Sequence, residues 1–198
     1  MKKKLLVPIT FLTVAAVTLI GLLTKEVSHT VTINKNIKDV WTYASDSTKA
    51  NEWSVYFSHI SPLPGVNDGK VGSLRRCFRR SNETGPRWDE EVVELKPKKY
   101  RQIRTFNLKN FNADILKLAQ FKVHQRYEFV DENTTKLTFA SSLMGPWRLD
   151  LILALLPSMK ESKRIFKLNL ENIKAAIEQG DDYKRPHPYE PKNQFDMI

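Results

Sequence analysis

Four carboxylates lie close together along the chain, at Asp89, Glu90, Glu91 and Glu94. Carboxylates serve as general acids and bases when a partly buried site adjusts their pKa. Side chains of an extended strand alternate between two faces, so Glu90 shares a face with Trp88 and Asp89 takes the other. We therefore expect one carboxylate to point inward, where burial raises a carboxyl pKa unless a cation pairs with it. Arg76 on the neighbouring strand is a candidate partner, and the alternative is an ion pair that lines a pocket mouth or a solvated strand end.

The residue pattern gives little support for a metal site, a phosphate-binding loop or a reactive cysteine. The four histidines, His29, His59, His124 and His187, contain no pair at metal-ligand spacing, and a zinc site needs three or four converging ligands. The seven glycines are not clustered as phosphate-binding loops require. The single Cys77 excludes an internal disulfide and is expected to be a small buried side chain. We expect no metal and no cofactor.

The elements that position these residues are mainly strands. Period-two alternation is clearest from Phe121 to Phe129, where apolar and polar side chains take turns. Short polar turns separate the strands, which predicts an antiparallel meander, preceded by two short helices around Val40 to Trp53. The segment 110–120 is either a helical excursion or part of a hairpin. The expected strands are 27–35, 55–60, 71–80, 88–95, 101–108, 121–129 and 137–143.

A long amphipathic helix is predicted from Ser158 to Gln179, after a separate short apolar helix over 149–156. Ser158 and Glu161 have capping-box spacing, and Pro157 stands where an upstream helix would stop. Apolar residues recur every three or four positions along it, which marks one buried face. Such a helix needs an apolar partner, and the preceding strands supply the surface.

The residues Val31-Thr32-Ile33, Val40-Trp41, Asp46, Trp53 and Gly69-Lys70-Val71-Gly72, in this element order, resemble the SRPBCC superfamily. This superfamily includes START and birch-pollen-allergen-like proteins, and the chain is most similar to its polyketide cyclase/dehydrase-like members. The resemblance implies an α+β helix-grip fold over 25–179. In that fold a curved antiparallel sheet of about six to seven strands surrounds a long C-terminal helix. It also implies a deep pocket between sheet and helix, commonly for lipids, sterols or other apolar molecules.

Candidate ligand contacts follow from the resemblance together with strand alternation. Gln125, Tyr127 and Ser141 are the polar groups expected to orient a ligand in an otherwise apolar pocket. Trp41 and Trp53 either wall the pocket or fill the core beneath it. The candidate ligand-binding residues are Arg76, Trp88, Glu90, Gln125, Tyr127, Phe139, Ser141, Phe166 and Leu170.

The two ends of the chain lie outside the resemblance. Three lysines precede an uncharged stretch from Leu5 to Leu23, long enough at about 1.5 Å per residue to span a bilayer as a helix. No small-x-small cleavage site follows it, so 1–24 is expected to be an uncleaved signal anchor. The lysines place the N-terminus in the cytoplasm and the domain on the periplasmic or other extracytoplasmic side. Residues 180–198 contain three prolines among charges, and an extended or mobile tail is expected.

Three functions remain open. The leading expectation is a membrane-anchored binding domain for an apolar small molecule or lipid, without covalent chemistry. The alternatives are a cyclase/dehydrase-like enzyme, with Glu90 or Asp89 and Arg76 acting on an apolar substrate, and a scaffold with a filled core. The basic clusters behind the net charge of +10 are either solvated strand faces, the leading interpretation, or sites for anionic headgroups beside an anchor, and no nucleic-acid partner is expected. The segment 147–156 is either a gate that touches the bilayer or a helix that packs on the sheet.

Overall fold

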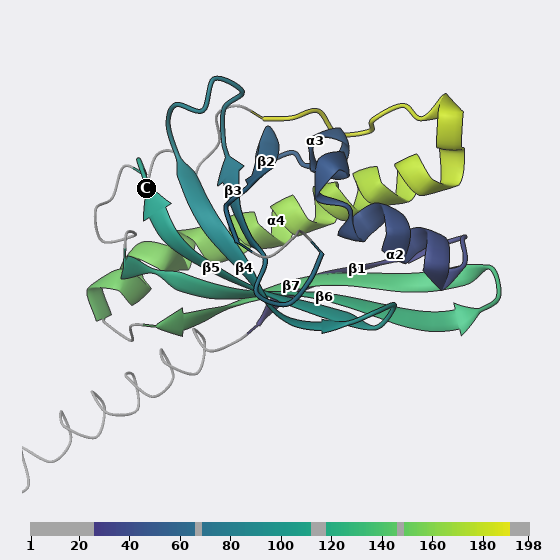
Figure 1. Ribbon diagram of the computed structural model, residues 1–198, viewed down its shortest axis with the longest axis horizontal. Helices are drawn as coiled ribbons and strands as arrows, with labels where there is room; N and C mark the ends of the chain where they lie inside the picture. The colour runs from purple at the N-terminus through teal and green to yellow at the C-terminus, as the bar shows by residue number, and fades with distance from the viewer. Residues whose placement is uncertain (1–25, 66–68, 112–117, 146–148, 191–198) are drawn as a thin grey trace, which may run out of the picture.

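A seven-stranded antiparallel sheet forms the framework of the part of the chain described by the computed structural model, residues 26–65, 69–111, 118–145 and 149–190 (Figure 1). Its spatial order is β1-β7-β6-β5-β4-β3-β2, so only β1 departs from a meander. The expected α+β helix-grip fold is therefore confirmed. The strands are β1 (Val27–Ile33), β2 (His59–Pro62), β3 (Leu74–Phe78), β4 (Arg87–Lys96), β5 (Tyr100–Lys109), β6 (Gln120–Asp131) and β7 (Thr134–Gly145).

The helices pack against this sheet. Figure 1 shows the long helix α4 (Leu149–Gln179) running across the sheet, with α2 (Ile37–Ser45) and α3 (Ala50–Trp53) beside its C-terminal half. Asn36 begins α2, because its side chain accepts a hydrogen bond from the Asp39 amide at 3.0 Å. Asp46 does the same for the short 3-10 helix η1 (Ser47–Lys49), through the Thr48 amide. A buried apolar cluster joins α2, α3 and α4 to β1, β6 and β7.

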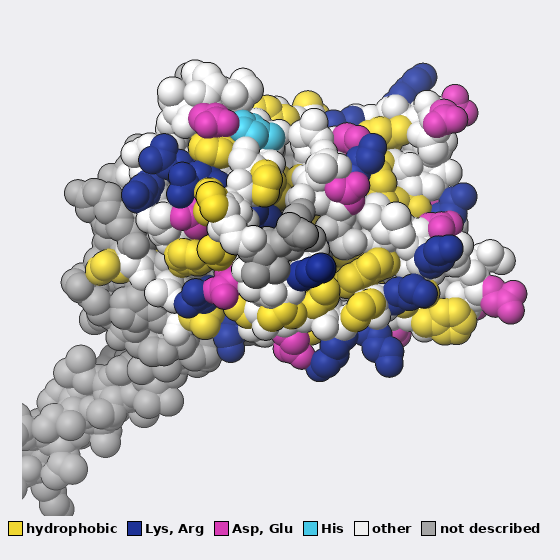
Figure 2. Space-filling model, viewed as in Figure 1, with side chains coloured by type: hydrophobic (Ala, Val, Ile, Leu, Met, Phe, Trp, Pro, Cys, Tyr) yellow, Lys and Arg dark blue, Asp and Glu magenta, His cyan; other side chains and the backbone are white. Residues whose placement is uncertain are grey.

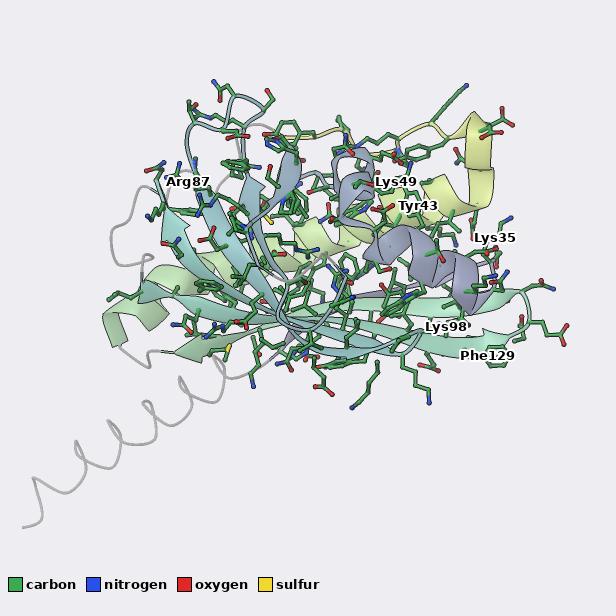
Figure 3. All side chains as sticks on the ribbon, viewed as in Figure 1. Lys35, Tyr43, Lys49, Arg87, Lys98 and Phe129 are labelled. Atoms are coloured by element: carbon green, nitrogen blue, oxygen red, sulfur yellow. The ribbon has the colours of Figure 1, made fainter. Side chains whose placement is uncertain are left out.

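The junction between α2 and α3 is fixed by one carboxylate. Glu52 accepts a hydrogen bond from the Tyr43 hydroxyl at 3.0 Å and from the Lys49 ammonium at 2.8 Å. Figure 3 shows Tyr43 and Lys49 close together at this junction. Not every large apolar side chain is buried: Phe129, near the end of the β6–β7 hairpin, is 60% exposed and points to solvent (Figure 3).

The long helix begins earlier than expected. The sequence predicted a start at Ser158 after a stop at Pro157, whereas α4 is continuous from Leu149 to Gln179. A proline removes one backbone hydrogen bond from a helix, which weakens it without necessarily ending it. Glu161 consequently does not close an N-terminal capping box. It pairs instead with Arg164, at 2.8 Å from the guanidinium Nε.

The first predicted strand after the short helices was misplaced. Residues 55–60 were expected to be a strand, but β2 is His59–Pro62. Val55 is fully buried, and its amide donates to the Asn169 side chain of α4 at 2.8 Å rather than to a neighbouring strand. Val55 is therefore buried against α4, whereas Tyr56 and Phe57 pack against Trp88 of β4.

The first part of the C-terminal tail is held against the body of the domain. After the short 3-10 helix η3 (Gly180–Asp182), the chain runs extended to residue 190. Arg185 donates to the carbonyl oxygens of Asn51 and Ser54, and the Glu190 amide donates to the Val55 carbonyl at 2.9 Å. The tail thus satisfies backbone groups where α3 ends.

Three expectations concern residues outside this description, and one of them is the form of the segment 110–120, of which 112–117 are not described. The anchor at 1–24 and residues 146–148 of the suggested gate are not among the described residues, nor are the side chains of 149–158. Within the described part of the chain, no helix is both long enough and apolar enough to cross a membrane. On the face shown in Figure 2, basic and acidic side chains are interspersed over several elements.

Candidate ligand-binding cavity

A cavity of about 210 Å³ lies between the sheet, the α2–α3 segment and α4. Its lining comes from six of the strands, β2 to β7, and from all of these helical elements. Most of the wall is apolar, and large aromatic side chains dominate it. These are Trp53, Tyr56, Phe57, Trp88, Phe111, Phe121, Phe139 and Phe166.

A buried ion pair stands in this apolar wall. The Glu90 Oε2 atom lies 2.8 Å from Nε and 2.7 Å from Nη2 of Arg75, and the Trp88 indole donates to Oε1 at 3.0 Å. Glu90 is 8% and Arg75 5% exposed. The antiparallel register places these two residues directly opposite each other on β3 and β4. Both therefore project from the same face of the sheet into the cavity.

The ionisation of Glu90 is set by its partners. Burial alone would raise the pKa of this carboxyl. The charge of Arg75, the hydrogen bonds from Trp88 and Arg75 and the charge of Arg101 outweigh burial, so the pKa lies below its ordinary value. Glu90 is therefore a carboxylate at neutral pH, and it is a weak proton acceptor.

Arg101 and Gln125 are a second pair of polar residues on the cavity wall. They face each other across β5 and β6 in the strand register. Arg101 is 3% exposed and donates from Nη1 to the Ser45 carbonyl at 2.8 Å. Gln125 accepts from the Tyr127 hydroxyl at 3.3 Å. The strand β5 thus carries a buried cation on the cavity side of the sheet.

The expected partnership of Arg76 with an inward carboxylate is wrong. Arg76 faces away from the cavity and pairs with Asp89, at 2.7 and 3.1 Å between guanidinium nitrogens and carboxylate oxygens. Burial raises the pKa of Asp89, but the hydrogen bonds from Arg76 and Asn107 outweigh it and the pKa is lowered. The error arose because β3 carries arginines on both faces, so its alternation does not show which one is buried.

Six of the nine candidate residues line the cavity, namely Trp88, Glu90, Gln125, Phe139, Ser141 and Phe166. Arg76, Tyr127 and Leu170 do not. Tyr127 packs edge-on against Trp41 at 4.8 Å between ring centroids, and Leu170 is fully buried in the apolar cluster. Whether any of these residues contacts a ligand stays a prediction.

Sequence reasoning missed Arg75, Arg101 and Thr105, which also line the cavity. Thr105 lies opposite Glu90, so Arg75, Glu90 and Thr105 form a row across three strands. The available signal was alternation in β5, where Arg101, Ile103 and Thr105 share a face. Two of these three residues are polar, so a search for alternating apolar residues did not identify their face as the buried one.

Other reactive groups do not converge on the cavity. Within the described residues, no three histidine, cysteine or acidic side chains are placed to hold a metal ion. Cys77 is fully buried as expected, and burial raises the pKa of its thiol. The thiol is therefore protonated at neutral pH and a poor nucleophile.

The family model for polyketide cyclase / dehydrase and lipid transport proteins matches residues 24–178. The chain belongs to this family. The SRPBCC resemblance expected from the sequence is thereby confirmed. No curated protein matches the chain significantly.

Solved structures share the fold of this polyketide cyclase-like chain at low sequence identity. DynU16, a putative protein in the dynemicin biosynthetic locus, has a TM-score of 0.58 at 16% identity over 83% of this chain and 49% of DynU16. The chain thus spans about half the length of DynU16. Protein MLL2253 from Mesorhizobium loti has a TM-score of 0.59 at 14% identity, covering 79% of this chain and 99% of its own. Truncated norcoclaurine synthase from Thalictrum flavum has a TM-score of 0.55 at 12% identity, covering 77% of this chain and 92% of its own.

Proposed function

We propose that this domain binds a small apolar molecule in the cavity between the sheet and α4. The observation that carries the proposal is a cavity whose exposed wall is mainly apolar and rich in aromatic rings, with polar groups set into it, which is the usual composition of a small-molecule site. A family that includes lipid transport proteins supports the same function. The cavity is smaller than the roughly 300–1,000 Å³ of typical drug-sized sites, which favours a single ring system or short chain over a diacyl lipid.

A cyclase/dehydrase activity has one specific observation in its favour, because Glu90 lines the cavity as that hypothesis requires. However, both of its oxygens already accept hydrogen bonds and its pKa is lowered. A general base works best with a pKa near the working pH. Glu90 is therefore better suited to hold Arg75 and the cavity wall in place, and binding without covalent chemistry remains our proposal.

Apolar cargo should co-purify with the protein and depend on the space in the cavity. Full-length protein is purified, denatured and extracted with organic solvent, and the extract is analysed by mass spectrometry. Ser141 lines the cavity, so Ser141→Phe should fill part of it and reduce the bound molecule about tenfold or more, as steric overpacking excludes a ligand.

Ser142→Phe is the matched control, because Ser142 is the next residue of β7 and is not part of the cavity lining. Unfolding midpoints of both variants show whether the sheet tolerates the added ring. Equal recovery of apolar molecules from wild type and a folded Ser141→Phe variant would contradict the proposal.

Anchoring of the domain to a membrane is part of the same proposal. The uncharged segment 5–23 should anchor the domain, with the N-terminus in the cytoplasm and the cavity on the other side. The full chain should then stay in the membrane pellet after alkaline washing. Val14→Arg should release a large fraction, since a charge at mid-bilayer costs about 2.5–3.5 kcal/mol. Val17→Leu is the control, and release of wild type by the same wash would rule out the anchor.

A further inference from the structure

The charged residues on the exposed side of α4 differ between its two halves. In the C-terminal half the signs alternate, with Lys174 3.7 Å from Glu178, which is typical of a helix face that meets only water. Between residues 159 and 170, in contrast, the exposed charged residues are all basic. They recur at three- and four-residue intervals and so share one face of the helix. We call them the lysine stripe, and its members are Lys160, Lys163 and Lys167.

The lysine stripe is not neutralised within the domain. Two of its lysines form no ion pair with another described residue, and the third, Lys167, lies 3.9 Å from Glu171. Arg164 on the flank of the stripe differs, because Glu161 and Glu190 both bind its guanidinium. The stripe thus presents positive charge that suits an anionic partner.

The lysine stripe lies beside the start of β1. The helix packs along this strand, and Lys174 Nζ donates to the Thr32 carbonyl at 2.7 Å near the end of β1. Lys163 and Lys167 are close enough to His29, near the start of β1, for their charges to act on its imidazole. A helix rises about 1.5 Å per residue and a strand about 3.3 Å, so the stripe is level with the first residues of β1.

The start of β1 is also close to the proposed anchor along the chain. Only Thr24 and Lys25 separate the uncharged segment 5–23 from Glu26. An extended chain covers at most about 3.6 Å per residue, so Glu26 lies within about 11 Å of the end of that segment. With the segment across a bilayer, as proposed above, the lysine stripe stays close to the headgroups. A tethered surface needs only weak attraction to dock, because its effective concentration is high.

We infer that the lysine stripe docks the domain on anionic headgroups of the bilayer that holds its anchor. This inference rests on the proposed anchoring and names the surface through which the domain meets the membrane. Each basic residue near an anionic surface favours docking about fivefold, so three lysines favour it about a hundredfold. Ser162 and Phe166, on the other side of this part of α4, line the cavity. Docking therefore places the α4 wall of the cavity next to the membrane.

Lysine acetylation tests the inference on the full chain in nanodiscs. One set of nanodiscs contains phosphatidylcholine alone, and the other contains phosphatidylcholine mixed with phosphatidylglycerol. After brief treatment with acetic anhydride, digestion and mass spectrometry give a modification rate for each lysine. The rates in the lysine stripe should fall about fivefold or more in the anionic nanodiscs. High salt should abolish the difference, because the Debye length falls to about 3 Å at 1 M.

Other lysines serve as controls in the same spectra. Lys35 and Lys38 are exposed and follow the far end of β1, where Figure 3 labels Lys35, and their rates should be equal in both nanodiscs. Lys122 lies opposite Ser142, near the start of β1, but next to the cavity-lining Val123 and thus on the outer face of the sheet. Lys122 should be protected less than the stripe. Equal protection of Lys122 would show that the domain docks through another face.

A double variant tests whether the charges of the stripe cause the protection. Lys160→Glu/Lys167→Glu leaves Lys163 as the reporter, and its protection in anionic nanodiscs should be lost. Lys35→Glu/Lys38→Glu makes the same change of net charge and should leave Lys163 protected. Unfolding midpoints of both variants show that these exposed substitutions keep the fold.

The results separate this inference from the proposed function. Equal acetylation of the stripe in both nanodiscs, or protection of Lys163 that survives Lys160→Glu/Lys167→Glu, would overturn the inference alone. If neither kind of nanodisc incorporates the chain, the proposed anchor fails and the inference fails with it. Cavity binding is tested separately by Ser141→Phe and does not depend on either result.

Discussion

Replacing Glu90 by glutamine should lower the free energy of unfolding by about 3–5 kcal/mol, the usual cost of breaking a buried ion pair from one side. The substitution leaves Arg75, only 5% exposed, opposite a neutral amide on the cavity wall. Urea denaturation followed by tryptophan fluorescence measures the change. A loss below 1 kcal/mol would show that the pair is not formed in the folded protein.

Glu91→Gln is the matched control, with the same substitution one residue later on β4. Glu91 pairs with Arg104, and these side chains are 26% and 39% exposed, so the loss should stay below about 1 kcal/mol. The double variant Arg75→Met/Glu90→Leu should recover most of the stability lost in Glu90→Gln. Apolar residues of similar volume avoid the desolvation of both charges.

The same pair gives a defined pH dependence. The folded pKa of Glu90 lies below the value of an unfolded glutamate, near 4.5. Its contribution to stability is therefore fully present above that value and is lost as the pH falls through the folded pKa. Between neutral pH and strong acid, wild type should lose more stability than the Arg75→Met/Glu90→Leu variant.

Asn172→Leu should cost about 3 kcal/mol, because one fully buried amide connects three segments of the chain. Its nitrogen donates to the Trp53 carbonyl at 2.9 Å and to the His187 carbonyl at 2.8 Å. Its oxygen accepts from the His187 amide at 2.9 Å. Leucine keeps the approximate volume but leaves these backbone groups without partners in a buried place.

Chemical denaturation and limited proteolysis together test this prediction. The unfolding curve measures the cost, and trypsin cleavage after Lys184 should become faster because the tail loses its bonds to α4. Asn51→Leu, at an exposed position of α3, should leave both measurements close to wild type. Unchanged cleavage in a destabilised Asn172→Leu variant would show that the tail is held by other contacts, such as the Arg164–Glu190 pair.

The sequence predicts the sheet well where a strand carries regular alternation. In β4 and β6 it correctly placed Trp88, Glu90 and Gln125 on the face that lines the cavity. It could not predict how far along that face the cavity extends. Tyr127 shares the face with Gln125 but is covered by Trp41, because α2 packs over that end of the sheet.

Charged strands and helix boundaries were harder to predict. In β3 the register with β4, rather than local hydrophobicity, decides that Arg75 is buried and Arg76 is not. Pairing across strands is a long-range property that one strand does not encode. At Pro157 a local rule predicted a helix end, and the continuous α4 shows that tertiary packing overrides it.

The position of β1 determines when the domain can complete its fold. β1 is at the edge of the sheet, and among the described strands it pairs only with β7, with Val27 opposite Ser141. The other strands pair with their neighbours in sequence, so each can form as soon as the next one is available. β1 must wait for β7, and residues near His187 arrive later still to close over α3. The earliest strand is thus among the last to be secured, and the edges of β1 and β7 that face each other stay unpaired until late in folding.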